Sequence, residues 1–405
     1  MERKIGNSLV ETRKKNRILI KKQIYHQTIP TRTQIAENLG LTLATLSTST
    51  NEMISQGIIE ETVSDLSVTC TGVGRKPKIL RFCPACACAA GIDIGPYKTR
   101  AVLMDMGGNI IDSLEDEAVQ NDYGRMIDMI ETLAKKLMLK VTGIFLGVSV
   151  SVAGIVDSSN GTMLKGIELK NTGEAGSIRK NLRTLLEDKL DCPVLIQNNA
   201  KTRALGHAIK NHIKDTIFAY LYVSRGIACP VMEPNELPYG YSASIGELGR
   251  MVMEWNSPDG KRLMTLNDVA GEHTIISRCR AAIESGRLKN LKKLCDSGRE
   301  LSIDLIMELD TEGDSEIRQL FESSCEYLGI ALSNVSCMIN PGMIVIDGYM
   351  FSNPRNRETL KSVYNEKCEA VDCSSASLFF IDYDSFAGAR SAAYCALDKL
   401  FLSVE

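Results

Sequence analysis

The sequence predicts an α/β protein in which a small helical head precedes a larger body with a mixed β-sheet, and three observations support this class. Residues 33–59 have the apolar spacing of two short helices joined at a tight turn. Residues 89–111 contain short apolar runs separated by glycine turns, and helical and strand-like segments alternate after them. Residues 1–82 carry 13 Lys/Arg and 7 Asp/Glu, a net +6, whereas the remaining residues carry −9. A basic head on an acidic body favours nucleic-acid binding by the head.

The overall composition is that of a globular protein large enough for two or three domains. The 405 residues are 44% hydrophobic and 24% charged. The charged N-terminus lacks the apolar segment of a signal peptide, and no apolar run reaches the ~20 residues that span a bilayer. We therefore expect a cytoplasmic protein without membrane contact.

The cysteine pattern predicts reduced thiols and no metal site. Thirteen cysteines, an odd number, are scattered along the chain. Cys83, Cys86 and Cys88 lie close together, with Cys70 upstream, but they lead directly into an apolar strand. Because a zinc site needs four ligands and no second Cys-x-x-Cys follows, we expect buried thiols here.

The stretch from Thr33 to Ile59 predicts the motif around which the head is organised. Ile35 and Leu39 recur at helical spacing, and Gly40 can adopt the left-handed conformation that ends a helix. Thr42 is suited to cap a second helix. The buried side of that second helix is expected to hold Leu46, Met53 and Ile54.

A helix, a glycine turn and a second helix are typical of the helix-turn-helix, whose second helix enters the DNA major groove. The expected DNA contacts from this motif are Thr33, Thr42, Leu43, Ala44, Thr45, Ser47, Thr48 and Asn51. Ser49 and Thr50 stand where such helices usually bury apolar residues. An unrelated helical hairpin is the alternative interpretation.

Basic segments flank this motif on both sides. The upstream basic residues are Arg13, Lys14, Lys15, Arg17, Lys21 and Lys22. Downstream, a Gly-rich basic tip between two short strands predicts a wing, in which Arg75 or Lys76 reaches a minor groove or phosphate. Because the second helix itself lacks Lys and Arg, we expect phosphate affinity to come from these flanks.

The body begins with hairpin strands and continues with alternating helices and strands. The expected strands cover residues 89–95, 99–104, 144–152 and 194–196, and a further strand is expected to start at residues 110–111. The expected helices include residues 123–139 and 178–189. This order indicates a mixed sheet.

Six segments spread over the chain after residue 88 carry a family resemblance. They are Gly91–Gly95, Gly147–Asp157 with Gly161, Gln197–Ala200 with Ala204–Gly206, Gly246–Arg250, Leu328–Gly348 and Gly388–Ala393. Together they resemble the ROK family (repressors, open reading frames and sugar kinases), and a winged helix in front is typical of its xylose-repressor-like branch. The resemblance implies an actin-like ATPase (sugar-kinase) fold of two subdomains. We expect a winged helix-turn-helix at 1–82, subdomain I at 83–200 completed by a helix at 387–405, and subdomain II with the dimer surface at 201–386.

The resemblance also implies that the phosphoryl-transfer chemistry is lost. A sugar kinase needs a carboxylate to accept the proton of the attacked hydroxyl, and the family's aspartate corresponds to Asn199. Pro96 and Tyr97 replace the glycine and threonine that follow the first phosphate loop, which removes an N–H group and fills space. The second phosphate loop reads Ser224–Gly226 and the nucleotide-side glycine pair reads Asp347–Gly348. We expect no catalysis and no cofactor.

The family's zinc module and sugar site are altered too. Arg250 corresponds to a metal-binding histidine, and residues 256–265 contain no cysteine, so we expect no structural zinc. The ligand-binding residues that the resemblance implies are Asn171, Asn198, Asn199, Glu247, Arg250 and Asn267. One interpretation is a pocket retuned for a sugar or related metabolite, in which Arg250 clamps an anion. The other is a relic cleft in which Glu247 and Arg250 form an ion pair.

We therefore expect a DNA-binding transcriptional regulator, a repressor, with a non-catalytic body. It would bind a near-palindromic duplex operator as a homodimer or tetramer. The first rival is a ROK-type sugar kinase with an accessory N-terminal domain, which would turn over ATP. The second rival is an interaction module whose head binds protein.

Overall fold

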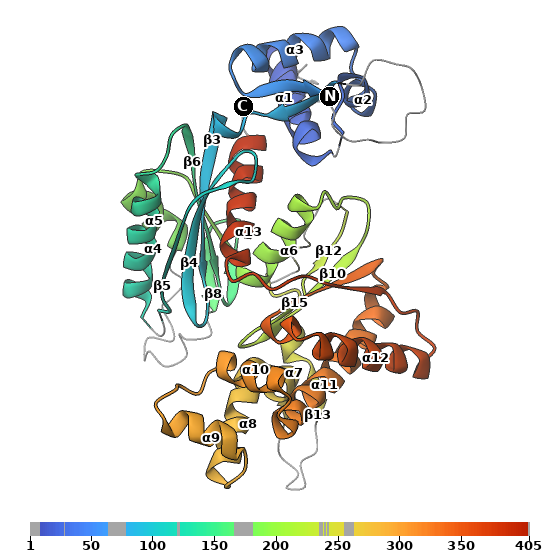
Figure 1. Ribbon diagram of the computed structural model, residues 1–405. Coiled ribbons are helices and arrows are strands. Elements are labelled where there is room, and N and C mark those ends of the chain that lie inside the picture. Colours follow the sequence, from blue (N-terminus) through green and yellow to red (C-terminus); the bar gives the residue numbers. More distant parts are fainter. Residues whose placement is uncertain are drawn as a thin grey trace, which may run out of the picture. The chain divides into compact units, whose positions relative to one another are not determined.

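The computed structural model describes residues 9–27, 29–63, 78–119, 122–165, 181–234, 238, 240, 243–254 and 263–403. The chain forms two compact units (Figure 1). Unit 1 comprises residues 1–213 and 386–405, so it contains the head and the C-terminal helix, and unit 2 comprises residues 214–385.

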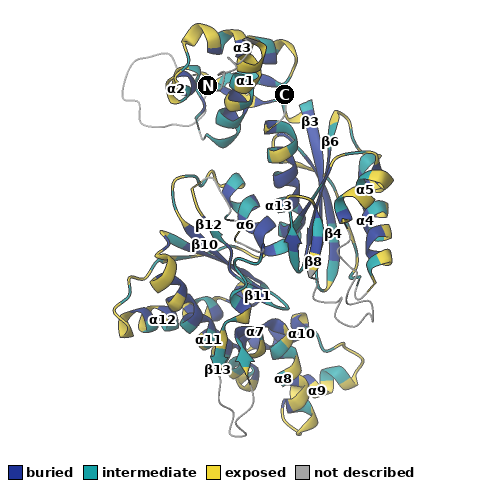
Figure 2. Cartoon of the chain, turned by 180° about the vertical axis from the view of Figure 1, so that it is seen from behind, coloured by how far each residue is buried: buried dark blue, intermediate teal, exposed yellow. Residues whose placement is uncertain are grey.

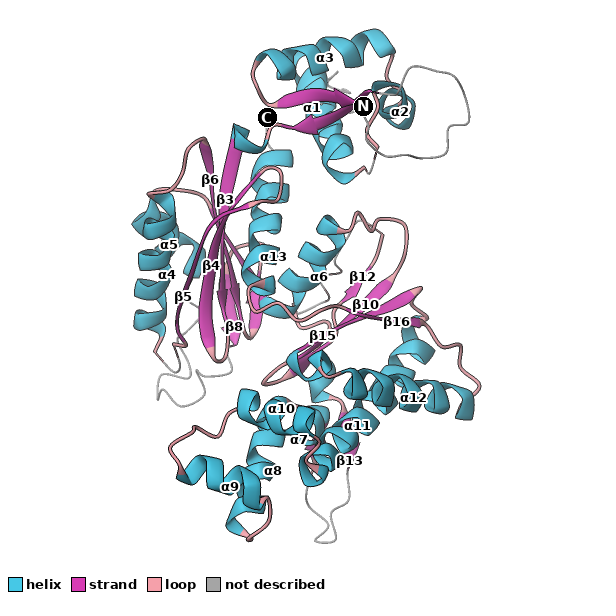
Figure 3. Ribbon diagram, in the orientation of Figure 1, coloured by secondary structure: helices cyan, strands magenta, loops and turns pink. Residues whose placement is uncertain are grey.

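The head is a three-helix bundle closed by a β-hairpin (Figure 3). Its elements are α1 Leu9–His26, α2 Arg32–Leu39, α3 Leu43–Ser55, β1 Ile59–Val63 and β2 Lys78–Phe82. The hairpin is antiparallel, with Ile59 opposite Phe82. The fully buried side chains of the head include Ile20, Ile35, Leu46 and Met53. The predicted helix-turn-helix is therefore present, and it consists of α2, the turn at Gly40 and α3.

Local chemistry explains the turn of this motif. Gly40 has φ 63° and ψ 28°, and its N–H group bonds to the carbonyls that α2 leaves open at Ala36 and Glu37. Thr42 caps α3 by accepting a hydrogen bond from the backbone N–H of Thr45 at 3.2 Å. Thr50 is fully buried, as expected, and its hydroxyl donates to the Leu46 carbonyl at 3.0 Å.

Unit 1 contains a five-stranded sheet in the order β5-β4-β3-β6-β9. Its strands are β3 Ala87–Ile94, β4 Lys98–Asp105, β5 Ile110–Glu117, β6 Ile144–Val152 and β9 Val194–Asn198. Strand β4 pairs antiparallel with both β3 and β5, whereas β3, β6 and β9 run parallel to one another. A mixed sheet was predicted, and the structure confirms it. The short hairpin β7 Ile155–Asp157 and β8 Thr162–Lys165 follows β6.

Helices cover both faces of this sheet (Figure 1). One face carries α4 Tyr123–Met138 and α5 Leu182–Leu190, and the other carries α6 Asn199–Lys210 and α13 Ala387–Ala396. All of β3 is buried between them, in dark blue in Figure 2. A Cβ atom added to Gly91 would lie 2.0 Å from the Ala389 carbonyl oxygen, so glycine allows α13 to approach β3 closely.

Some predicted bounds of unit 1 differ from the structure. The helix expected from residue 178 is α5, which begins at Leu182, and residues 178–180 lie outside the described residues. The strand expected to start at residues 110–111 is β5, which runs from Ile110 to Glu117 with the alternating exposed and half-buried residues of an edge strand. The C-terminal helix continues from α13 into a π-helical segment, η5 Leu397–Leu402. A short 3-10 helix, η1 Pro84–Cys86, joins the head to β3.

Unit 2 is built on a second sheet with parallel β10, β15 and β16. Its strands are β10 Phe218–Val223, β11 Ile227–Ala228, β12 Val231–Met232, β15 Met343–Gly348 and β16 Ser377–Phe380, with a separate hairpin of β13 Val252–Glu254 and β14 Met264–Thr265. Its helices are α7 Leu266–Ala270, α8 Glu272–Glu284, α9 Lys289–Asp296, α10 Ile303–Glu312, α11 Ser315–Ile339 and α12 Pro354–Ala370. The turns η3 Leu248–Arg250 and η4 Tyr349–Ser352 complete it.

The compact units divide the chain after Ile213, whereas the sequence placed the boundary at residue 200, inside α6. Helix α6 packs on α13 and therefore belongs with unit 1. The division into a head and two actin-like subdomains stays a prediction. No helix in the described part of the chain combines the length and the apolar character needed to cross a membrane.

The head packs on the C-terminal segment of its own unit. The buried apolar residues of the head and of α13 and η5 belong to one cluster, which includes Ile20, Leu80, Ala393 and Leu402. The ring of Phe82 in β2 meets the ring of Phe401 edge-on, with centroids 5.5 Å apart. The head is thus joined to the body by apolar packing as well as by the chain.

Candidate functional site

The exposed face of α3 is the strongest candidate for a nucleic-acid interface. Leu43 is 53% exposed, although it is a large apolar side chain on a helix with a well-packed opposite face. The other exposed candidates on or beside this face are Thr33, Thr42, Ala44, Thr45, Thr48 and Asn51, and Ser47 is half-buried. The residues expected to face DNA therefore share one accessible surface. Small, uncharged side chains allow such a helix to enter a major groove.

Arg32 adds a cation to this surface, which the sequence reasoning missed. Its Nη2 donates to the Asn51 Oδ1 at 3.0 Å, and its Nε donates to the Glu61 Oε1 at 2.8 Å. Lys78 also bonds Glu61, at 3.0 Å, and these hydrogen bonds lower the pKa of that carboxyl group, with Lys78 as the largest cause. The network fixes the amide of Asn51 on α3. Arg32 stands at the first position of α2, so a charge count of α3 alone could not find it.

Not all of the basic residues of α1 are available for the phosphate binding that the sequence had suggested. Lys21 is only 4% exposed, and its ammonium group donates to the Phe401 carbonyl at 2.6 Å. The assignment of Lys21 to phosphate binding is therefore wrong, because tertiary packing turns this residue toward the body. Arg13 pairs with Glu52, and Arg17 donates to Gln56, so both contact the end of α3.

Three predicted site residues lie outside the described residues. Arg75 and Lys76 of the expected wing and Asn171 of the expected ligand site belong to this group. Their assignments stay predictions.

A buried charged cluster occupies the carboxyl edge of the parallel strands in unit 1. Asp93 on β3 stands in register with Ser151 on β6, whose hydroxyl donates to the Asp93 Oδ1 at 2.6 Å. The Nη2 of Arg203, from α6, lies 3.5 Å from the Asp93 Oδ2. A Cβ atom added to Gly388 would lie 1.9 Å from the same oxygen, so α13 closes the cluster from its side. Asp93 thus has an internal counter-ion, which sequence reasoning did not identify.

The two asparagines expected in the ligand site lie beside this cluster, where β9 meets α6. Asn198 caps α6: its Oδ1 accepts from the Lys201 N–H at 3.0 Å, and its Nδ2 donates to the Gly154 carbonyl at 2.7 Å. The Oδ1 of Asn199 accepts from the Ala200 N–H at 2.9 Å. Asn198 therefore has a structural role that explains its position without a ligand.

The residues that replace the expected phosphate loops have defined positions. Pro96 and Tyr97 form the tight turn between β3 and β4, closed by a hydrogen bond of 3.1 Å from the Gly95 N–H to the Lys98 carbonyl. In unit 2, Asp347 is 3% exposed and accepts a hydrogen bond of 2.8 Å from the hydroxyl of Tyr220. Both positions are filled by side chains rather than by glycine.

The other expected ligand residues belong to unit 2. Arg250 Nε and Glu247 Oε2 form an ion pair of 2.9 Å, one turn apart. The Oδ1 of Asn267 accepts from the Ile227 N–H at 2.8 Å and lies close to Gly249. Glu247, Arg250 and Asn267 are therefore near neighbours in sequence or structure, whereas Asn198 and Asn199 belong to unit 1. In the part of the chain that the structure describes, no three His, Cys, Asp or Glu side chains gather as metal ligands.

Comparison with protein families places most of the body in one group. The family model described as ROK family matches residues 89–399. A xylose repressor of Caldicellulosiruptor bescii is 26% identical over 363 residues, which cover 87% of this chain and 88% of that protein. A xylose repressor of Bacillus subtilis is 25% identical over 380 residues, covering 90% of this chain and 92% of that protein.

Solved structures show the same fold. A ROK family transcriptional regulator, described as a homologue of the Escherichia coli MLC protein, superposes with a TM-score of 0.72 at 19% identity, covering 97% of this chain and 98% of that chain. A ROK family glucokinase from Streptomyces griseus, solved with glucose and AMPPNP, has a TM-score of 0.63 at 16% identity and covers 76% of this chain and 98% of its own. The predicted fold class, a winged helix-turn-helix head before an actin-like body, is confirmed.

Proposed function

The chain belongs to the ROK family, and on that premise we propose that it is a DNA-binding transcriptional repressor. The observation that carries the proposal is the exposed face of α3, which presents Thr42–Thr45, Thr48 and Asn51 on a helix held by a capped glycine turn. The proteins named xylose repressor align with this chain over most of its length. Helix α3 would read base edges in the major groove.

Phosphate contacts would come from cations beside α3. Arg32 stands next to Asn51, and its guanidinium group is planar and always charged, so it suits a phosphate at the groove edge. Arg75 and Lys76 would add contacts from the wing. A homodimer presents two heads, so the operator would be a near-palindrome with half-sites spaced by turns of the duplex.

The kinase-like body would carry no phosphoryl transfer. A kinase site needs open carboxylates for Mg²⁺ and backbone N–H groups near the phosphates. Here Asp93 is engaged by Ser151 and Arg203, and the turn after β3 holds Pro96 and Tyr97. Asn199 cannot accept a proton as a general base does. The residues therefore do not fit a nucleotide with its metal ion, and no catalytic step is assigned.

The body would instead sense a sugar or a related metabolite. In unit 1, Asn199 is the polar replacement best suited to contact it, because an amide both donates and accepts hydrogen bonds. A ligand acts on DNA binding only to the extent that it prefers one state of the protein. Thermal unfolding with xylose, with arabinose as the control, tests this point: a xylose-specific rise that Asn199→Ala removes supports it.

DNA binding is tested by selecting bound duplexes from a random pool and measuring mobility shifts at two salt concentrations. We expect a salt-dependent complex with a near-palindrome. Ala44→Glu places a negative charge on the exposed face and should abolish the complex. Ser55→Glu places the same charge at the far end of α3 and should retain it. Absence of any selected duplex, or equal loss in both variants, would contradict DNA binding by this face. A repressor of this kind acts in the cytoplasm.

A further inference from the structure

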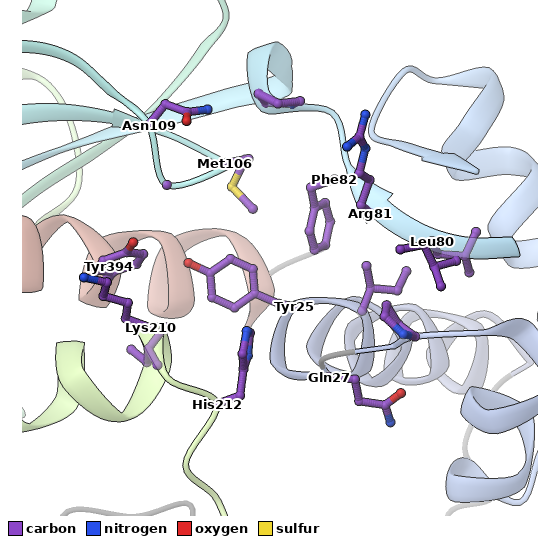
Figure 4. Close-up of a pocket in the computed structure, with 17 residues that line it drawn as sticks. Tyr25, Gln27, Leu80, Arg81, Phe82, Met106, Asn109, Lys210, His212 and Tyr394 are labelled. Carbon is purple, nitrogen blue, oxygen red and sulfur yellow. The ribbon is translucent and has the colours of Figure 1, made fainter. Parts of the chain in front are cut away.

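A cavity of about 460 Å³ opens between the head and the body within unit 1 (Figure 4). Its head wall comes from the end of α1, Pro30 and β2, and its body wall comes from the turn after β4, the end of α6 and α13. This volume falls within the roughly 300–1,000 Å³ that small-molecule sites occupy. It is separate from the sheet edge that holds Asn198 and Asn199.

The floor of the cavity is apolar and the mouth is polar. Leu80, Phe82 and Met106 line it and are buried. Four exposed polar residues line the mouth, namely Arg81, Asn109, Lys210 and His212. A ligand that fits would place an apolar body inside and a polar group at the opening.

The charged side chains that line the cavity are cations, and the nearby carboxylates of Asp398 and Asp105 lie outside the lining. None of the seventeen lining residues is Asp or Glu, whereas Arg81 and Lys210 are cations. Arg81 is already paired with Glu60, at 2.6 Å, so Lys210 is the more available of the two. His212 follows Lys210 closely at the end of α6, with a left-handed φ of 53°.

Two tyrosine hydroxyls add uncharged hydrogen-bond donors to the lining of the cavity. Figure 4 shows Tyr25 from α1 and Tyr394 from α13 approaching the same space from opposite walls. Burial, and next the neighbouring Tyr394, raise the pKa of the Tyr25 phenol, so it keeps its proton at physiological pH. The hydroxyl of Tyr394 lies against the turn, because a Cβ atom added to Gly108 would come within 2.9 Å of it.

We propose that this cavity binds a small amphipathic organic anion, a carboxylate on an aromatic or similarly apolar body. The apolar body packs between Phe82, Met106 and the two tyrosine rings, and the carboxylate meets Lys210 at the mouth. Because the walls come from both the head and the body, the ligand stabilises the docked arrangement of the head. Its effect on operator affinity rests on the proposed function, whereas its binding does not.

The test is calorimetric titration of the full chain with three probes: 2-naphthoate, its neutral analogue 2-naphthalenemethanol, and glucose 6-phosphate. We expect saturable binding of 2-naphthoate at one site per chain and at least about tenfold weaker binding of the alcohol, because the charged contact is lost. Glucose 6-phosphate should not compete. Binding of glucose 6-phosphate in place of 2-naphthoate would overturn the apolar class of ligand.

Two variants assign the binding to this cavity. Lys210→Glu should weaken 2-naphthoate about tenfold or more, and Ile209→Trp should block it by filling the cavity from a half-exposed position. Lys361→Glu makes the same charge change on α12, in unit 2, and should leave binding unchanged. No binding of 2-naphthoate, or binding unaffected by both cavity variants, would overturn the proposal. The titration contains no DNA, so a negative result leaves DNA binding by α3 to its own test.

Discussion

The ammonium group of Lys21, in the head, donates a hydrogen bond of 2.6 Å to the backbone carbonyl of Phe401, near the other end of the chain. The same group lies 4.5 Å from the centre of the Phe401 ring. A few residues along each segment, His26 Nε2 lies 3.1 Å from Asp398 Oδ1. The head is therefore held to the body by partly buried polar contacts as well as by apolar packing.

Replacing Lys21 with methionine should loosen this attachment. Methionine keeps the apolar stem but cannot donate, so the stability of unit 1 should fall by about 1.5–3 kcal/mol, the usual range for a hydrogen bond from a charged group. Urea unfolding measures the loss, and amide exchange should rise in α1. Lys22→Met, at the next and less buried position, is the matched control. Equal effects of the two changes would contradict the role of Lys21.

Removing the counter-ion of Asp93 should be costly. Arg203→Ala leaves a buried carboxylate without its cation, and we expect a loss of about 3–5 kcal/mol in unfolding free energy. Asp93→Asn combined with Arg203→Ala should be less destabilising than the sum of the single changes, because the two groups interact. Additive losses in urea titrations would show that the ion pair contributes nothing.

Restoring a carboxylate should not restore kinase activity. Asn199→Asp supplies a proton acceptor, but Arg203 still engages Asp93 and Pro96 still occupies the turn after β3. A coupled assay for ADP with glucose or xylose should therefore detect no turnover above that of the original chain. Sugar-dependent turnover in the variant would show that a single residue separates this body from a catalyst.

The hydrogen bond between Arg32 and Asn51 should matter for operator affinity. Arg32→Ala removes a cation and frees the amide of Asn51, and Asn51→Ala removes the amide itself. Each should cost about 1–3 kcal/mol of binding free energy, and only Arg32→Ala should reduce the salt dependence. Gln34→Ala, on the exposed side of α2, serves as the control in the same mobility-shift assay. An unchanged salt slope in Arg32→Ala would place this arginine away from phosphate.

Thiol chemistry should separate buried from accessible cysteines. Burial raises the pKa of Cys229, Cys279 and Cys325 to about 12, so these thiols stay almost entirely protonated at pH 7.5. Iodoacetamide should therefore leave these three unmodified in the folded chain, whereas the exposed Cys337 should react. Mass spectrometry of digested protein reports each site. Early modification of Cys325 would mean that the core around α11 opens readily.

The sequence predicted best where short-range chemistry decides the structure. Gly40 ends α2 and Thr42 begins α3 through hydrogen bonds to groups only a few residues away. The helix-turn-helix could therefore be predicted from the local sequence. The mixed sheet could also be predicted from the sequence, because apolar runs and glycine turns mark its strands. Glu247 and Arg250 form the ion pair that one of the two sequence interpretations had offered.

Contacts between segments that are distant in the sequence could not be predicted in this way. Lys21 looks like any surface lysine until Phe401 is placed beside it, and Arg203 looks like an exposed helix residue until Asp93 is found within 3.5 Å. Arg32 escaped notice because its partner lies on the next helix. The cavity lined by Tyr25 and Tyr394 joins five segments, and no local pattern marks it.

Helix α13 and η5 complete unit 1, although the chain builds all of unit 2 before it reaches them. During synthesis, the head and its neighbouring sheet therefore emerge from the ribosome long before the segment that fills their shared core. The nascent chain must keep the apolar surface around Ala89 and Val102 from aggregating while the intervening residues are translated. We expect its folding to be slow for its size, with chaperones engaged until the last helix docks.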